Sequence, residues 1–285
     1  MKNKLKMILH VFIHLLVFVG VQSLIVVVTG LIYGVIESIR FLDEGNATLD
    51  TFQIENQIQG FIFEKMPIIL IASFFISVAI YLIIFKIRKI NILEAGGFSK
   101  MKFINIPSLL IFSVAINIFL SFVIVAIEGF MSSDEIFLKH EELMNIIMGS
   151  SNIFLLLISV GILFPVLEEV VFRGFIFSEL KKNMNVIWAV IIQALLFGLV
   201  HLNIVQGTYA FFLGIILACV YIWTKSIWAP IIVHIVFNSY SVLANEYPQI
   251  GEYNVFTLVA STILVVLTIL LIYKNREIPE RSELA

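Results

Sequence analysis

Long apolar stretches without charged residues alternate with short polar segments along the whole chain. They are continuous in Ile, Leu, Phe and Val, and they lack the polar–apolar alternation that is typical of barrel strands. In lipid, only helices and closed barrels satisfy their own backbone hydrogen bonds. The pattern therefore predicts an all-α, polytopic membrane helical bundle with about eight transmembrane helices. The charge-free stretches lie at residues 7–36, 67–85, 104–127, 146–167, 185–200, 208–224, 227–244 and 254–273.

The composition supports a membrane location. Of the 285 residues, 60% are hydrophobic and 13% are charged, whereas soluble domains carry about 45–50% apolar and about 25% charged residues. The formal net charge of −2 provides no basic surface for a nucleic acid partner. The single cysteine, Cys219, excludes a disulfide framework and a thiolate metal cluster. The expected surroundings are therefore a lipid bilayer.

The basic residues are distributed unevenly between alternate loops. One side of the predicted bundle has 15 of the 18 Lys and Arg residues, and the other side has 3 of them together with 13 of the 20 acidic residues. Because Lys and Arg accumulate in cytoplasmic loops, both termini are predicted to be cytoplasmic. The segment from Glu37 to Lys65, with six acidic residues, is predicted to be an acidic outer loop that is at most partly ordered.

Three motifs place ionisable or polar residues inside apolar helices, where such groups are costly and indicate function by default. They are Glu168-Glu169-x-x-x-Arg173, Phe197-x-x-x-His201 and His234-x-x-x-Asn238. Adjacent glutamates diverge by about 100° on a helix and cannot serve the same purpose. The i, i+4 spacing of Glu169 and Arg173 suits an intrahelical ion pair.

The remaining polar groups of these motifs suit hydrolytic chemistry. An unpaired Glu168 in an apolar site is suited to act as a general base. His234 and Asn238 are one helical turn apart and share a face, so their side chains could form a donor pair for a developing oxyanion. His201 stands alone beside Phe197. As a structural alternative, any single one of these polar residues could lie in a helix–helix contact that satisfies its hydrogen bonds.

Hydropathy alone would end the fourth helix at Leu167 and place Glu168 and His201 at opposite membrane boundaries. The segment up to Leu180 remains compatible with a helix and contains no proline. With a turn near residues 181–183, Glu168 lies about 14 residues before the turn and His201 about 18 after it, so their depths differ by about 6 Å. The fourth and fifth helices are therefore predicted to form a long hairpin that protrudes into the cytoplasm.

At these motifs the sequence resembles the CAAX protease and bacteriocin-processing family of intramembrane endopeptidases, also called the Abi family. Its signature is E-E-x-x-x-R, F-x-x-x-H and H-x-x-x-N or D, and every signature position is filled here. The resemblance covers roughly residues 148–245. It suggests a protease core at residues 146–245, preceded by a three-helix membrane region with the acidic outer loop (1–145) and followed by a final helix and cytoplasmic tail (246–285).

The resemblance implies peptide-bond hydrolysis in a membrane cavity that is open to the cytoplasm. By this resemblance Glu168 activates a water molecule with help from His201, and His234 and Asn238 stabilise the oxyanion, while Glu169, Arg173 and Phe197 support the site. The expected partner is a peptide or protein substrate within or next to the membrane. The heavy use of Ile, Lys, Asn and Phe resembles the amino-acid usage of an AT-rich bacterial genome. Together with the predicted transmembrane helices, this usage predicts a multi-pass protein of the bacterial plasma membrane.

The requirement for a metal is a separate question. Glu168, His201 and His234 offer a carboxylate and two imidazoles that would suit zinc. The H-E-x-x-H motif is absent, however, and the resembled family is better described as a metal-independent glutamate type. No cofactor is therefore expected, with zinc on these three residues as the alternative.

Two other functions compete with the endopeptidase. A non-catalytic bacteriocin-immunity or regulatory scaffold protein could use the same fold as a binding surface. A transporter would need an internal repeat and polar groups in both halves, and the motifs lie only in the second half. His10 and His14, one turn apart on the first helix, suit helix packing, pairing with another helix or, as an alternative, ligand binding.

Overall fold

The computed structural model describes residues 2–43, 51–131, 135, 137–140, 142, 144, 152–251 and 254–278. Within these residues the secondary structure is helical and no strand occurs. Six of the described helices are long and apolar enough to cross a membrane. The predicted polytopic helical bundle is therefore confirmed. The spans are Asn3–Asp43, Thr51–Ile87, Asn105–Ile127, Ile153–Asn183, Ile204–Thr224 and Val255–Lys274.

Among the described residues of the first half of the chain, the helices with defined bounds are α1 (Lys2–Asp43), α2 (Thr51–Ile87), α3 (Ile92–Ala95) and α4 (Asn105–Met131). The next helix is continuous and consists of α6 (Ile153–Leu156), η1 (Leu157–Leu163), α7 (Phe164–Glu169), η2 (Val170–Phe177) and α8 (Ser178–Asn183). Its segments η1 and η2 are π-helical. The predicted start at residue 146 and the boundary at residue 145 lie outside the described residues.

The second half continues with α9 (Val186–Leu199), α10 (Ile204–Thr224), α11 (Trp228–Glu246), the 3₁₀ segment η3 (Pro248–Gly251) and α12 (Val255–Lys274). α9 is apolar but has only 14 residues, and α11 is not among the six spans. The count of eight transmembrane helices and the cytoplasmic position of the termini therefore stay predictions. The last residues of the predicted tail, 279–285, lie outside the description.

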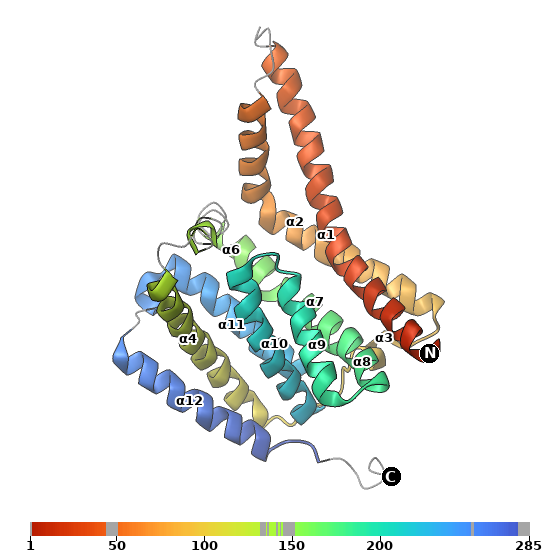
Figure 1. Cartoon of the computed structure of the whole chain (residues 1–285), viewed down its shortest axis with the longest axis vertical. Helices are drawn as coiled ribbons and strands as arrows, with labels where there is room; N and C mark the ends of the chain where they lie inside the picture. Colours follow the sequence, from red (N-terminus) through yellow and green to blue (C-terminus); the bar gives the residue numbers. More distant parts are fainter. Residues whose placement is uncertain are drawn as a thin grey trace.

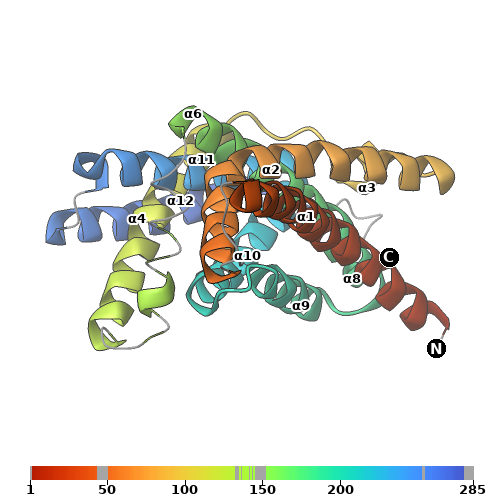
Figure 2. The same ribbon diagram turned by 90° about the horizontal axis from the view of Figure 1, so that it is seen from above.

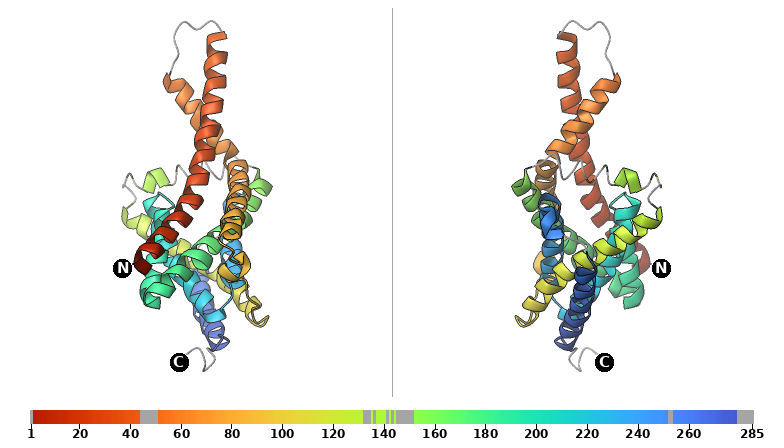
Figure 3. Two further views of the ribbon diagram at one scale, coloured as in Figure 1. Left: turned by 90° about the vertical axis from the view of Figure 1, so that its right-hand side faces the viewer. Right: turned by 90° about the vertical axis from the view of Figure 1, so that its left-hand side faces the viewer.

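α1 and α2 form an antiparallel pair that rises above the rest of the bundle (Figures 1 and 3). Gly30 and Gly34 are one turn apart on α1, and a Cβ at Gly34 would lie 2.8 Å from Ile58 Cδ1. Small residues at this spacing let two membrane helices approach closely. Beside them the rings of Tyr33 and Phe61 stack at 3.9 Å. Residues 37–43 and 51–65 of the predicted acidic outer loop are helical, and the part between them lies outside the described residues.

α2 changes direction along its length (Figure 2), and Pro67 lies inside it. Proline cannot donate the helical hydrogen bond, and its ring displaces the preceding turn, so it kinks a helix. The bend takes the second half of α2 along the helix Ile153–Asn183, which it contacts at η1 and α7. α1 contacts the same long helix at η2 and α8.

The predicted long hairpin of the fourth and fifth helices is present. The helix runs through the motif to Asn183, and Met184 then adopts an extended conformation. Asn185 caps α9 by accepting a hydrogen bond from Ile187 N. The helix therefore continues beyond Leu167, where hydropathy alone would end it. Protrusion of the hairpin into the cytoplasm stays a prediction.

Two hydrophobic clusters hold the bundle together. The first joins α1, α2, the helix Ile153–Asn183, α9 and α10, and it is rich in phenylalanine. The second joins α4, α10, α11 and α12. His14 is buried near Tyr81, Phe85 and Phe175. His10 contacts Glu179 at 3.1 Å and Arg88 at 3.3 Å, so both histidines take part in contacts between helices.

We predict that Gly198→Ala destabilises the bundle. α9 and α10 touch through glycines, and a Cβ at Gly198 would lie 2.6 Å from the backbone oxygen of Gly207. The backbones would have to separate, which typically costs about 1–3 kcal/mol. Thermal unfolding of the detergent-solubilised chain measures the loss.

The matched control is Gly60→Ala on α2, where an added Cβ meets nothing within 4 Å. That substitution should leave the melting temperature equal or raise it, since alanine favours a helix by about 1 kcal/mol. Equal melting temperatures for both variants would contradict the close α9–α10 contact.

Candidate active site

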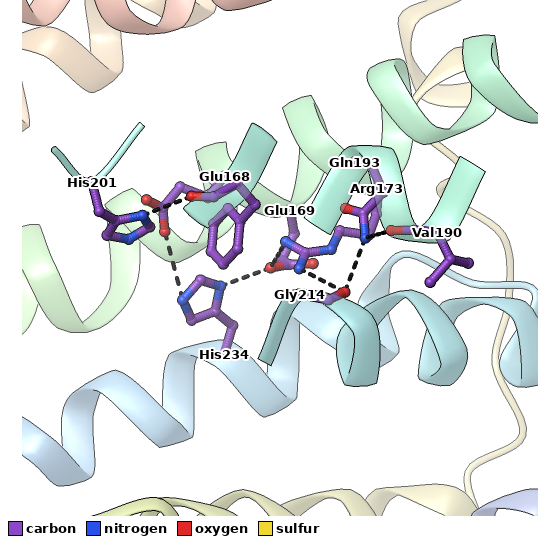
Figure 4. A network of polar contacts seen from close by, with 9 residues as sticks. Glu168, Glu169, Arg173, Val190, Gln193, His201, Gly214 and His234 are labelled. Carbon is purple, nitrogen blue, oxygen red and sulfur yellow. Dashed lines mark hydrogen bonds and ion pairs between the residues drawn. The ribbon is translucent and has the colours of Figure 1, made fainter. Parts of the chain in front are cut away.

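The Glu169 carboxylate is the centre of a buried polar network (Figure 4). Arg173 donates from Nη1 to Glu169 Oε1 at 2.8 Å, which confirms the intrahelical ion pair. The same oxygen lies 2.7 Å from His234 Nδ1. Glu169 and Arg173 are completely buried, and His234 is 3% exposed. One carboxylate oxygen thus joins the helix Ile153–Asn183 to α11.

Glu168 faces the other nitrogen of the same imidazole. Its Oε2 lies 3.6 Å from His234 Nε2, and Figure 4 shows the ring between the two glutamates. Because the Glu169 carboxylate can only accept, His234 Nδ1 has to donate. Nε2 then carries a hydrogen only when the ring is protonated. The two adjacent glutamates therefore have different surroundings, as expected, but they share one histidine, which the spacing did not predict.

His201 lies in the turn after α9, one helical turn beyond Phe197. Its Nδ1 donates to the Phe197 carbonyl at 2.8 Å, so Nε2 of the neutral ring is an acceptor. The Phe197 ring packs edge-on against His201 and His234, with centroid distances of 5.1 and 5.8 Å. Its face lies 4.5 Å from the Arg173 guanidinium carbon. Phe197 thus contacts both histidines and the arginine, and its supporting role stays a prediction.

Asn238 is held through the irregular part of the long helix. Its Nδ2 donates to the carbonyl of Val160 at 3.1 Å, and Ser239 Oγ donates to the carbonyl of Gly161 at 3.3 Å. Both acceptors belong to the π-helical segment η1, and such segments often occur at functional sites. One hydrogen of the Asn238 amide is used in this contact, and the second remains for another acceptor.

The four candidate catalytic side chains line one cavity of about 430 Å³. Glu168 comes from α7, His201 from the turn after α9, and His234 and Asn238 from α11. Gln206 and Tyr209 of α10 add polar groups to the same cavity. Residues of all three motifs therefore line one cavity, and their catalytic roles stay predictions. The motifs gave no signal for the two α10 residues.

Gln193 is another buried residue that the motifs missed. It is fully buried, and its Nε2 donates to the carbonyl of Gly214 at 3.0 Å. Arg173 Nη2 donates to the same carbonyl at 3.2 Å. A Cβ at Gly214 would lie 3.1 Å from Ala194, so glycine permits this approach of α10 to α9. The available signal in the sequence was a glutamine inside an otherwise apolar stretch.

The alternative zinc set is not assembled. Among the residues that the structure describes, no three His, Cys, Asp or Glu side chains are placed to hold a metal ion. His201 and His234 use Nδ1 for the Phe197 carbonyl and for Glu169, and these contacts leave both Nε2 atoms available as ligands. Zinc on Glu168, His201 and His234 therefore stays an alternative, and the reaction proposed below includes no step through a metal.

Residues 150–240 match the family model described as Type II CAAX prenyl endopeptidase Rce1-like. This segment is similar to the Rce1-like family. The Rce1-like segment contains every residue of the three motifs, so the resemblance based on them is confirmed. No solved structure matches the chain.

Two bacterial relatives share a part of the chain. YdiL, a candidate membrane peptidase of Bacillus subtilis (strain 168), is 34% identical over 94 residues, which cover 33% of this chain and 38% of YdiL. The membrane-embedded CAAX protease MroQ of Staphylococcus aureus (strain USA300) is 39% identical over 90 residues, 30% of this chain and 36% of MroQ. The likeness thus spans less than two fifths of either relative. The relatives and the six spans agree with a multi-pass bacterial membrane protein.

We predict that Arg173→Met strongly destabilises the chain. It would leave the Glu169 carboxylate as a buried charge without its guanidinium, a change that typically costs about 3–5 kcal/mol. Adding Glu169→Gln should recover part of the loss, because the uncompensated charge is removed. Thermal unfolding in detergent compares the two variants.

The control for this prediction is Lys182→Met, which removes an exposed cation from the same long helix. Its unfolding should match that of the original chain. A melting temperature of Arg173→Met as high as that of Lys182→Met would show that the buried pair contributes no stability.

Proposed function

We propose that the chain is an intramembrane endopeptidase that hydrolyses a peptide bond with a water molecule activated by Glu168. One observation carries the proposal: Glu168, His201, His234 and Asn238 line one cavity, while the neighbouring Glu169 is neutralised by Arg173. The match of residues 150–240 to the Rce1-like family supports the same activity.

In the proposed reaction, Glu168 and Nε2 of His201 hold a water molecule in the cavity. The water oxygen attacks the scissile carbonyl carbon while one of its protons passes to the Glu168 carboxylate. General base catalysis of this kind contributes about 10²–10⁴ to a rate. Glu168 then transfers the proton to the amide nitrogen, the C–N bond breaks, and a carboxylate and an amine are released.

The negative charge on the carbonyl oxygen would be stabilised by His234 and Asn238. His234 Nε2 can donate only from a protonated ring, because Nδ1 already donates to Glu169. Glu169 then supplies the opposite charge directly beside that ring. Asn238 contributes the amide hydrogen that Val160 does not use. Preformed donors of this type are worth about 2.7–4 kcal/mol each in the transition state.

The proposed substrate is a peptide or protein within or next to the membrane. The cavity is lined mainly by apolar side chains, and its polar groups are the motif residues together with Gln22, Gln206, Tyr209 and Ser241. A mostly apolar pocket with a few placed polar groups is typical of binding sites that orient a ligand for chemistry.

We predict that Glu168→Gln, Glu168→Ala and His201→Ala abolish proteolysis but leave membrane insertion unchanged. The expected loss is at least about 10²-fold for the base. Peptidomics of the membrane fraction, with and without a chelator, compares these variants with the original chain. Glu179→Gln is the matched control, because this carboxylate lies on the same long helix and contacts His10 instead of the cavity.

Cleavage products that persist in Glu168→Ala would overturn the proposed mechanism. An immunity or regulatory effect that survives Glu168→Ala, with no products in any strain, would favour the scaffold alternative. Loss of products on chelation alone would show that a metal is required.

A further inference from the structure

Two helices outside the Rce1-like segment contribute a wall to the catalytic cavity. Phe63, Met66 and Leu70 of α2 line it, together with Phe18 and Gln22 of α1. The family match begins only at residue 150. The side of the cavity formed by α1 and α2 is therefore supplied by a different part of the chain from the side that carries Glu168.

The three α2 residues, called the α2 wall below, share one face of the helix. They are spaced at i, i+3 and i+7 on either side of Pro67, which lies where α2 bends. Each is partly buried, and none belongs to either hydrophobic core cluster. By contrast, Phe75 on the same helix is 61% exposed. The α2 wall thus faces the cavity and is neither core nor fully exposed surface.

The chemistry of the α2 wall is apolar and adaptable. It consists of an aromatic ring, a thioether and a branched aliphatic chain, and methionine readily fills irregular spaces. Glu168, His201, His234 and Asn238 line the same cavity. A substrate whose scissile carbonyl approaches these groups would therefore place a neighbouring side chain against the α2 wall.

We propose that the α2 wall determines substrate preference by binding a large apolar side chain next to the scissile bond. This inference rests on the proposed endopeptidase function. Apolar pockets discriminate by size, and a change of one methylene alters specificity by about 10–200-fold. Residues Phe63 and Met66 set the depth of the pocket, and Pro67 holds them in place.

The test uses the full chain reconstituted in vesicles of phosphatidylglycerol and phosphatidylethanolamine. The probe is a library of quenched-fluorescent peptides that carry Ala, Val, Leu, Phe or Trp at one scanned position. Phe63→Ala and Met66→Ala should shift the ratio of kcat/KM values about 10-fold or more toward the larger side chains. Met66→Trp should shift it toward the smaller ones.

Phe75→Ala is the matched control, because it truncates an exposed phenylalanine of the same helix, and its profile should equal that of the original chain. Identical profiles for all active variants would overturn the proposed role of the α2 wall in substrate preference without contradicting the endopeptidase proposal. If the original chain cleaves no more of the library than Glu168→Gln, the endopeptidase proposal fails instead.

A binding measurement then tests, independently of cleavage, whether the peptide lies against the α2 wall. A benzophenone amino acid at position 66 or 75 is photo-crosslinked to the biotinylated peptides in the Glu168→Gln background. Crosslinking that is stronger at position 66 than at position 75, and that increases with the size of the apolar residue of the peptide, supports substrate binding at the α2 wall. Equal crosslinking at the two positions, or none at 66, overturns it.

Discussion

The arrangement of the site depends on the buried carboxylate of Glu169. Removing a carboxylate and a guanidinium from water is costly, and only close pairing with further hydrogen bonds compensates for it. Here Arg173 and His234 both reach one oxygen of Glu169, at 2.8 and 2.7 Å. Arg173 also reaches the Gly214 carbonyl of α10 and lies over the Phe197 ring of α9. Four helices therefore meet at one charge-compensated point. The tautomer of His234 is one consequence, and the freedom of Glu168 to face the cavity is another.

Irregular helix geometry occurs where the chain lines this cavity. π-helical segments flank α7 on both sides, and Pro67 interrupts α2. In a bilayer, disturbed backbone hydrogen bonding is tolerated where it is buried in protein or lines a cavity. The carbonyls of Val160 and Gly161 illustrate the benefit, because they accept hydrogen bonds from Asn238 and Ser239 of α11. The deviations from a regular helix thus help to position the third motif against the first.

Much of this could be predicted from the sequence because helical spacing is local. The helix positions followed from charge-free stretches, the Glu169–Arg173 pair from an i, i+4 spacing, and the hairpin after Glu168 from the lack of a helix breaker before Lys182. Contacts between distant segments left no such signal. The contact between His234 and Glu169 spans 65 residues. Phe63 lies in the predicted outer loop and Met66 just before a charge-free stretch, so the sequence gives no signal that either lines the cavity. The segment from Glu37 to Lys65 was predicted to be an outer loop that is at most partly ordered, because its sequence did not reveal the close α1–α2 packing at Gly34.

The two walls of the cavity differ in how much change they can tolerate. Catalytic groups need placement within about 0.5 Å of the productive geometry, and here that placement depends on a buried ion pair that fails when either partner is lost. Apolar residues of similar volume can replace one another at a cost usually below about 1.5 kcal/mol. On the proposed assignment, a chain can therefore change its substrate through α1 and α2 while the Rce1-like segment keeps the same chemistry. This asymmetry gives a physical reason why the recognisable similarity is confined to the segment that holds the charged network.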